Sequence, residues 1–210
     1  MPPEIVAGAD ALDRLAARIA AVPPRGARRM VALAGPPAAG KSTVAAVLAA
    51  ALPDAVAVPM DGFHLDNRIL TARGLLARKG APETFDAAGF VHAAARLAAG
   101  ETVIWPDFDR ARDLSVAGAL EVGGRATTVV IEGNWLLLDA APWREAWWDS
   151  TVALDVPDDV LRARLVRRWL DHGLDEAAAV ARAEGNDMVN AARFRDGSRP
   201  ADVIWRGAEE

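Results

Sequence analysis

Two side-chain types are missing from this sequence, which has no cysteine and no tyrosine. Without cysteine the chain can form no disulfide, no thiolate zinc site and no cysteine nucleophile, and its redox compartment stays undecided. Lysine is nearly missing too, because only two of the 24 basic residues are lysines, Lys41 and Lys79. The longest apolar stretch, residues 44–52, is far shorter than the ~20 residues that cross a bilayer, and residues 1–10 lack the pattern of a signal peptide. We therefore expect a cytoplasmic protein without a membrane partner.

The charge balance is acidic, with 24 basic and 29 acidic residues, a net charge of −5 and an isoelectric point near 5.3. Nucleic-acid binders depend on a basic surface, so we expect no nucleic-acid partner, although a local phosphate site is allowed. The 210 residues are 52% hydrophobic. This length and composition suit one globular domain with a sizeable core, over residues 1–210.

Apolar residues recur at helical and strand spacing along the chain. Leu12, Leu15 and Ile19 predict an opening helix within residues 1–27, with Asp10 as its cap. Strands are expected at residues 30–34, 55–58, 103–105, 127–131, 151–156 and 201–205, and helices at residues 44–52, 86–99 and 175–194 and after Pro157. Because strands alternate with helices, the sequence predicts an α/β fold with a parallel sheet covered by helices on both faces.

Local features between residues 100 and 150 predict structure rather than chemistry. Proline donates no hydrogen bond to a sheet, so we expect Pro106 to stop the strand at residues 103–105. A glycine pair at residues 123–124 suggests the turn of a hairpin within residues 114–125. Trp143 and Trp147 are at helical spacing, which is more typical of a core or a subunit contact than of base stacking.

Residues 35–42 match the pattern G-x-x-x-x-G-K-S without a mismatch. In such a loop successive backbone N–H groups point at phosphates, the following helix adds its positive N-terminal end, the lysine reaches the outer phosphates and the serine holds Mg²⁺. The alternative is an ordinary glycine-containing turn, but the position between an apolar strand and a helix favours the phosphate loop. The nucleotide-binding residues expected here are Gly35, Pro36, Pro37, Ala38, Ala39, Gly40, Lys41, Ser42 and Thr43.

Two carboxylates follow apolar strands. Asp61 comes after the strand at residues 55–58, and Glu132 follows the strand at residues 127–131. Ligands of open α/β sheets bind at the carboxyl ends of the strands, where Asp61 could take a proton from an attacking hydroxyl and Glu132 could stand near a metal. The alternatives are an Asp that caps a turn and a solvent-exposed strand-end Glu. Ser42, Asp61 and Glu132 are the expected metal-site residues.

A helix after Pro157 carries three arginines that fall together on one face, Arg164, Arg167 and Arg168. They could clamp nucleotide phosphates, or they could form a solvated face, as most charge runs do. His64 lies three residues after Asp61 and is a candidate substrate contact. We expect His92, His172 and the tryptophans to lie outside the site.

Five segments together carry a resemblance to one family: residues 35–42, 60–64 (MDGFH), 78–86 (RKGAPETFD), 106–110 (PDFDR) and 131–134 (IEGN). In order and spacing they resemble the superfamily of uridine kinase, phosphoribulokinase and bacterial pantothenate kinase, most of all its short bacterial branch labelled as fructose-transport-associated. The resemblance covers about residues 28–206.

The resemblance implies a P-loop kinase fold that uses ATP and Mg²⁺. It implies that Lys41, Ser42 and Thr43 bind ATP and metal, that Asp61 is the catalytic base, and that Glu132 lies near Mg²⁺. An arginine of the 164–168 group, Arg164 or Arg168, would belong to a lid at about residues 160–195. Residues 78–86 and 107–112 would face the acceptor, and their candidate contacts are Lys79, Phe85, Asp109, Arg110 and Arg112.

These residues predict an ATP-dependent kinase that phosphorylates a hydroxyl of a small polar metabolite, such as a nucleoside, a sugar or a pantothenate-like alcohol. The alternative is a regulatory ATPase module that binds a nucleotide but has no acceptor. A GTPase is disfavoured because the chain has no Asn-Lys-x-Asp motif, and residues 185–188 (GNDM) are not one. The acceptor, the preference for ATP over GTP and the option of a homodimer stay open.

Overall fold

The structure is a computed structural model that describes residues 3–8 and 10–206. Its main sheet has six parallel strands in the order β1-β8-β7-β2-β6-β3. The strands are β1 (Glu4–Val6), β2 (Arg29–Ala34), β3 (Ala55–Pro59), β6 (Thr128–Gly133), β7 (Ser150–Leu154) and β8 (Val203–Trp205). The prediction of an α/β fold with a parallel sheet is confirmed, while β1 at the edge was not predicted.

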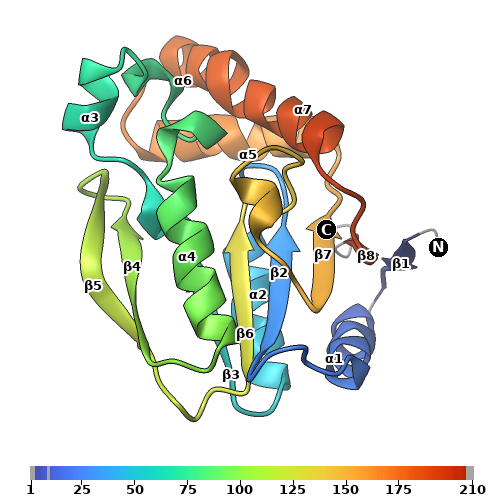
Figure 1. Cartoon of the computed structure of the whole chain (residues 1–210). Helices are drawn as coiled ribbons and strands as arrows, with labels where there is room; N and C mark the ends of the chain where they lie inside the picture. The colour runs from blue at the N-terminus through green and yellow to red at the C-terminus, as the bar shows by residue number, and fades with distance from the viewer. Residues whose placement is uncertain (1–2, 9, 207–210) are drawn as a thin grey trace.

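Helices cover both faces of this sheet (Figure 1). The α-helices of the described residues are α1 (Ala11–Ala21), α2 (Lys41–Ala51), α3 (Asn67–Ala72), α4 (Ala87–Ala98), α5 (Asp158–Asp171), α6 (Glu176–Arg182) and α7 (Met188–Gly197). In Figure 1, α4 lies in front of the sheet, α2 lies behind it, and α5 to α7 lie beyond the arrowheads of β2 and β6. None of the described helices combines the length and the apolar composition of a membrane span.

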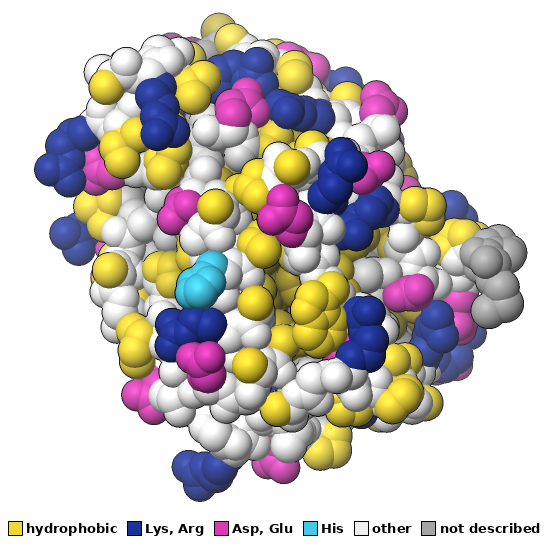
Figure 2. All heavy atoms as spheres, viewed as in Figure 1, with side chains coloured by type: hydrophobic (Ala, Val, Ile, Leu, Met, Phe, Trp, Pro, Cys, Tyr) yellow, Lys and Arg dark blue, Asp and Glu magenta, His cyan; other side chains and the backbone are white. Residues whose placement is uncertain are grey.

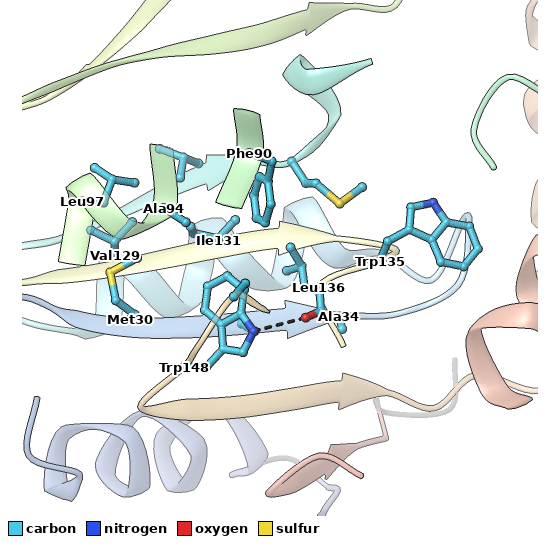
Figure 3. Close-up of a cluster of buried hydrophobic side chains, with 14 of the residues drawn as sticks. Met30, Ala34, Phe90, Ala94, Leu97, Val129, Ile131, Trp135, Leu136 and Trp148 are labelled. Carbon is cyan, nitrogen blue, oxygen red and sulfur yellow. Dashed lines mark hydrogen bonds between the residues drawn. The ribbon is translucent and has the colours of Figure 1, made fainter. Parts of the chain in front are cut away.

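The buried strands alternate between two hydrophobic clusters. Met30 and Ala32 of β2 pack with α4 and the tryptophan-rich loop after β6, whereas Val31 and Leu33 pack with α1, α2 and α5. Successive side chains of a strand point to opposite faces, so one continuous apolar run supplies both cores. Figure 3 shows the first cluster, in which the indole Nε1 of Trp148 donates to the carbonyl of Leu136 at 3.1 Å.

A separate hairpin is formed by β4 (Val103–Asp109) and β5 (Leu114–Val122). The predicted stop at Pro106 was wrong, because the register of the pair shifts between Trp105 and Asp107 and the strand continues past the proline. Such irregularities are where a two-stranded ladder tolerates proline. The hairpin turn therefore lies between Asp109 and Leu114, not at residues 123–124 as predicted.

Two helix predictions also need correction. The helix expected at residues 175–194 is interrupted by a π-helical segment, Ala183–Asp187, between α6 and α7. Asp10 stands at the start of α1 but its side chain caps no backbone N–H; its carboxylate lies 3.4 Å from the guanidinium of Arg14 instead. Acidic and basic side chains are interspersed over the face seen in Figure 2.

Arg28, just before β2, ties several loops together although its side chain is only 2% exposed. Its Nε and both terminal nitrogens donate to five backbone carbonyls, from Leu97, Gly100, Glu101, Gly123 and Ala126. Buried carbonyls that lose their donors cost free energy. The guanidinium fork thus joins the end of α4 to the loop that enters β6.

Replacement of Arg28 by lysine tests this role. Arg28→Lys should lower the free energy of unfolding by roughly 2–4 kcal/mol, because an ammonium cannot reproduce the planar set of donors and leaves carbonyls unpaired. Urea denaturation measures the change. Arg73→Lys, at an exposed position, is the control and should shift stability by less than about 0.5 kcal/mol. Equal midpoints for Arg28→Lys and wild type would contradict the account.

Candidate active site

Three neighbouring strands end level with one another at one edge of the sheet. β2 pairs with β6 up to Ala34 and Gly133, and β3 pairs with β6 up to Pro59 and Glu132. A Cβ at Gly133 would lie 2.5 Å from the Cβ of Met60, so only glycine allows this close approach. The loop after β2, the end of β6 and the segment after β3 therefore meet at this edge.

The phosphate loop follows β2 and enters α2. Two of its residues have left-handed backbone, Ala38 with φ 61° and Gly40 with φ 86° at the N-cap of α2. A positive φ is uncommon for a residue other than glycine and carries a strain cost. The ammonium of Lys41 donates to the carbonyl of Pro36 at 3.0 Å, so the lysine folds back over the loop. Such a loop presents N–H groups to an anion.

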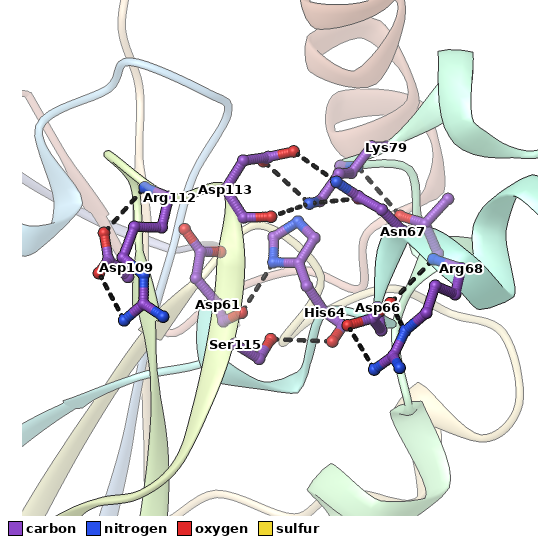
Figure 4. A network of polar contacts seen from close by, with 12 residues as sticks. Asp61, His64, Asp66, Asn67, Arg68, Lys79, Asp109, Arg112, Asp113 and Ser115 are labelled. Atoms are coloured by element: carbon purple, nitrogen blue, oxygen red, sulfur yellow. Dashed lines mark hydrogen bonds and ion pairs between the residues drawn. The ribbon is translucent and has the colours of Figure 1, made fainter.

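The carboxylates of Asp61 and Glu132 have separate partners. The Ser42 hydroxyl donates to Oε1 of Glu132 at 2.9 Å, and the Arg110 guanidinium lies 2.8 Å from Oδ2 of Asp61. His64 Nδ1 lies 2.7 Å from the backbone carbonyl of Asp61. The other ring nitrogen, Nε2, takes no part in this contact. Figure 4 shows Asp61 beside His64 and the hairpin turn.

Burial and neighbouring charges shift the pKa values of the two carboxylates in opposite directions. Burial raises the pKa of Glu132, and the charge of Asp61 adds to the rise although Lys41 opposes it. Burial also acts on Asp61, but the positive charges of His64, Arg110 and Lys41 outweigh it and hold its pKa below the ordinary value. Burial lowers the pKa of Lys41. Asp61 is thus the carboxylate that stays ionised to lower pH.

These residues line one cavity of about 500 Å³. A second cavity of about 360 Å³ adjoins it and shares five lining residues with it, namely Ser42, Asp61, Phe108, Arg110 and Glu132. The two carboxylates and the ion pair of Arg110 consequently lie where the two spaces meet.

Most of the predicted site residues line the larger cavity, but several do not. Those that do are Pro37, Ala38, Gly40, Lys41, Ser42, Thr43, Asp61, His64, Lys79, Arg110, Glu132 and Arg168. Gly35, Pro36 and Ala39 belong to the loop but not to the lining. Phe85 is buried against His64, with ring centroids 3.9 Å apart. The remaining three, Asp109, Arg112 and Arg164, lie outside the cavity, Arg112 and Arg164 at exposed positions.

Lys79 lines the cavity, yet its ammonium is engaged by the protein itself. It donates to Oδ1 of Asn67 at 2.7 Å and to the carbonyl of Asp113 at 2.7 Å, and it lies 2.8 Å from the Asp113 carboxylate. An ammonium has three N–H groups. With all three engaged, Lys79 fastens the turn of the hairpin to α3 (Figure 4), and its side chain is only 9% exposed.

One wall of the cavity comes from α5, the π-helical segment and the helices that flank it, and its residues are Arg168, Trp169, His172, Arg182, Asp187 and Asn190. Of these six residues, the sequence predicts only Arg168. The expectation that His172 and every tryptophan lie outside the site was wrong for His172 and Trp169. The Trp169 indole donates to Oδ2 of Asp187 at 2.6 Å, and burial raises the pKa of Asp187. No local motif signals the other five residues of this wall.

The oxygen atoms at this edge of the sheet suit a magnesium ion that is bound partly by the protein and partly by the phosphates of a nucleotide. Within the described residues no cluster of three or more His, Asp or Glu side chains could hold a metal by itself. Mg²⁺ commonly binds through one or two carboxylates together with water and substrate phosphates. Ser42 and Glu132 are hydrogen-bonded to each other, and Asp61 is nearby. These side chains offer the oxygen ligands that Mg²⁺ needs from the protein.

The raised pKa of Glu132 gives a stability prediction. Above that pKa the folded protein holds a buried anion, which the neutral amide of Glu132→Gln avoids while still accepting from Ser42. At pH 7 we expect Glu132→Gln to raise the free energy of unfolding by about 0.5–2 kcal/mol. The gain should fall as the pH is lowered and vanish below the ordinary glutamate pKa of about 4.3, because Glu132 is then protonated in folded and unfolded chains alike.

Urea denaturation of both proteins at a series of pH values measures this difference. Glu121→Gln changes an exposed carboxylate of β5 in the same way and is the matched control. A Glu132→Gln protein that is less stable than wild type at pH 7 would contradict the assignment of a destabilised buried anion.

Comparison with known proteins gives three informative relatives. The crystal structure of a Silicibacter sp. TM1040 protein, named provisionally as a fructose transport system kinase, is 53% identical and superposes with a TM-score of 0.88 over 92% of this chain and 98% of that one. A Schizosaccharomyces pombe protein named provisionally as a uridine kinase is 34% identical over 194 residues, 84% of this chain and 82% of the relative.

A third relative is the uncharacterized protein YggC of Escherichia coli (strain K12), which is 38% identical over 191 residues, 87% of this chain and 79% of the relative. No profile of a known family matches the chain. Two of these relatives have kinase names, and each match covers more than four fifths of both chains. The chain belongs to the uridine kinase-like P-loop kinases.

Proposed function

We propose that this kinase transfers the γ-phosphoryl group of ATP to a hydroxyl of a small polar metabolite. One observation carries the proposal: a single cavity is lined by the phosphate loop, by the Asp61 carboxylate and by a polar wall that the loop does not need for binding phosphates. A regulatory ATPase without an acceptor would have no use for that wall. The names of the relatives mention uridine and fructose, which differ in chemistry but both carry hydroxyl groups.

The nucleotide side of the cavity binds phosphates. The loop N–H groups and the N-terminal end of α2 attract them, and Lys41 would exchange the carbonyl of Pro36 for the outer phosphates. Ser42 and Glu132, with Asp61 nearby, would hold Mg²⁺. When bound, the metal neutralises charge on the phosphate oxygens.

Asp61 acts on the acceptor side. A hydroxyl placed against its carboxylate gives up its proton to Asp61 while the oxygen attacks the γ-phosphorus, and the bond from that phosphorus to the bridging oxygen breaks to release ADP. The side chain is 20% exposed and opens on both cavities, so an acceptor can reach it. Arg110 holds one carboxylate oxygen at 2.8 Å, which fixes the orientation of the other.

Arg168 is the candidate lid arginine. It lines the cavity from α5, and burial lowers the pKa of its guanidinium, which nonetheless stays charged at neutral pH. A guanidinium there can offset negative charge that develops during transfer. Arg164, which the sequence offers equally, is exposed in this structure.

The base can be tested by a nearly isosteric substitution. Asp61→Asn should bind ATP at least as tightly as wild type, because it removes a negative charge from the cavity. It should form ADP about 10²–10⁴ times more slowly, because an amide cannot take the proton. Calorimetric titration with AMP-PNP measures binding, and ADP release in the presence of uridine, pantothenate, D-ribose, D-fructose or glycerol measures turnover.

Asp139→Asn is the control, since Asp139 forms a surface pair with Arg144 away from the cavity. Turnover by Asp61→Asn at the wild-type rate with an active acceptor would refute Asp61 as the base. ADP release that none of the five compounds stimulates in wild type would instead favour the ATPase alternative.

A further inference from the structure

Asn190 of α7 is a buried amide whose oxygen the protein does not satisfy. Its side chain is 1% exposed and lines the larger cavity, and among the described residues its Oδ1 has no hydrogen-bond partner. A buried polar atom without a partner costs free energy. Where such an atom lines a cavity, a bound ligand can supply the missing partner.

The neighbouring amide provides the comparison. Asn186, one turn earlier, is similarly buried at 4% exposure, but its amide donates to the carbonyl of Lys79 at 2.9 Å and it is not part of the cavity lining. Asn186 therefore has a structural partner, and Asn190 does not. Both face Gly80, because a Cβ built there would lie 3.8 Å from Nδ2 of Asn190 and 4.0 Å from Nδ2 of Asn186.

The π-helical segment sets this arrangement. Residues 183–187 form the π-helical turn directly before α7, and such turns are frequent at functional sites because they rotate the residues that follow. Asp187, its last residue, lies three positions before Asn190, and both line the cavity. Residues three apart on a helix share a face.

The chemistry of the pair favours a neutral hydroxyl as its ligand. A hydroxyl can donate to an amide oxygen or a carboxylate and accept from an amide N–H. An anionic group would meet the Asp187 carboxylate, and the nearby ammonium of Lys79 already has three partners within the protein. The Gly80 carbonyl is engaged too, by the Trp135 indole at 3.0 Å.

We propose that Asn190 is a specificity-determining residue that binds a second hydroxyl of the acceptor, one that is not phosphorylated. The acceptor is then a polyhydroxylated molecule held between Asp61 and the α7 wall. This inference rests on the proposed kinase function and adds the substrate class to it.

Asn190→Leu and Asn190→Ala test the proposal with the full chain. Both should raise the KM for an active acceptor about tenfold to a hundredfold and leave the KM for ATP unchanged. Asn190→Leu should also keep or raise the unfolding temperature, because it replaces an unsatisfied polar group by an apolar one. Asn186→Leu is the matched control and should lower the unfolding temperature, because it leaves the Lys79 carbonyl without its donor.

The acceptors tested are uridine, D-ribose, D-fructose, glycerol and pantothenate, each with ATP. Deoxy analogues of the best acceptor complete the experiment: one of them should lose activity with wild type and lose no more with Asn190→Ala, since the same contact is then removed twice.

An acceptor KM that does not change in either Asn190 variant, or one that rises together with the KM for ATP, would overturn the proposal. So would the failure of both variants to fold, because the amide would then be structural. Absence of phosphorylated product from every acceptor with wild type is a different result, which refutes the proposed function and with it this inference.

Discussion

The site depends on the parallel register of three strands. Because β2, β6 and β3 pair in register up to their last residues, three segments distant in sequence end at the same edge of the sheet. The close approach of Gly133 to Met60 sets how near the Glu132 and Asp61 backbones come. The groups proposed to bind phosphate, to bind the metal and to accept the proton all lie at that edge. This agrees with the general position of ligand sites at the carboxyl ends of parallel strands.

Stability and function are distributed differently over the molecule. Arg28, far from the cavity lining, is buried with each of its nitrogens hydrogen-bonded to the backbone, and it consolidates the fold. Glu132, Asp187 and Asn190 are buried at the cavity with raised pKa values or an unpaired atom, and we expect each of them to lower the stability of the fold. Such groups persist where binding or catalysis requires them.

The parts of the site that could be predicted from the sequence are those that depend on short local patterns. The phosphate loop is one contiguous motif, Asp61 follows β3, and Glu132 is the second-last residue of β6, so both predictions needed only the order of elements. The predicted position of the hairpin was wrong because the glycine pair at residues 123–124 favours a turn there and Pro106 predicts the end of a strand that continues past it. Trp169 and Asn190 were missed because their approach to the cavity depends on a π-helical turn and on long-range packing, neither of which has a local signal. The partners of Lys79 likewise come from two separate segments.

The central claim is that this cavity joins nucleotide and acceptor in one transfer step. Mass spectrometry of a reaction of wild-type protein with ATP and a mixture of polyhydroxylated compounds tests it most directly, alongside assays of ADP and free phosphate. The account predicts a phosphorylated compound in an amount equal to the ADP formed, with little free phosphate. ADP accompanied by an equal amount of free phosphate and no phosphorylated compound would contradict it.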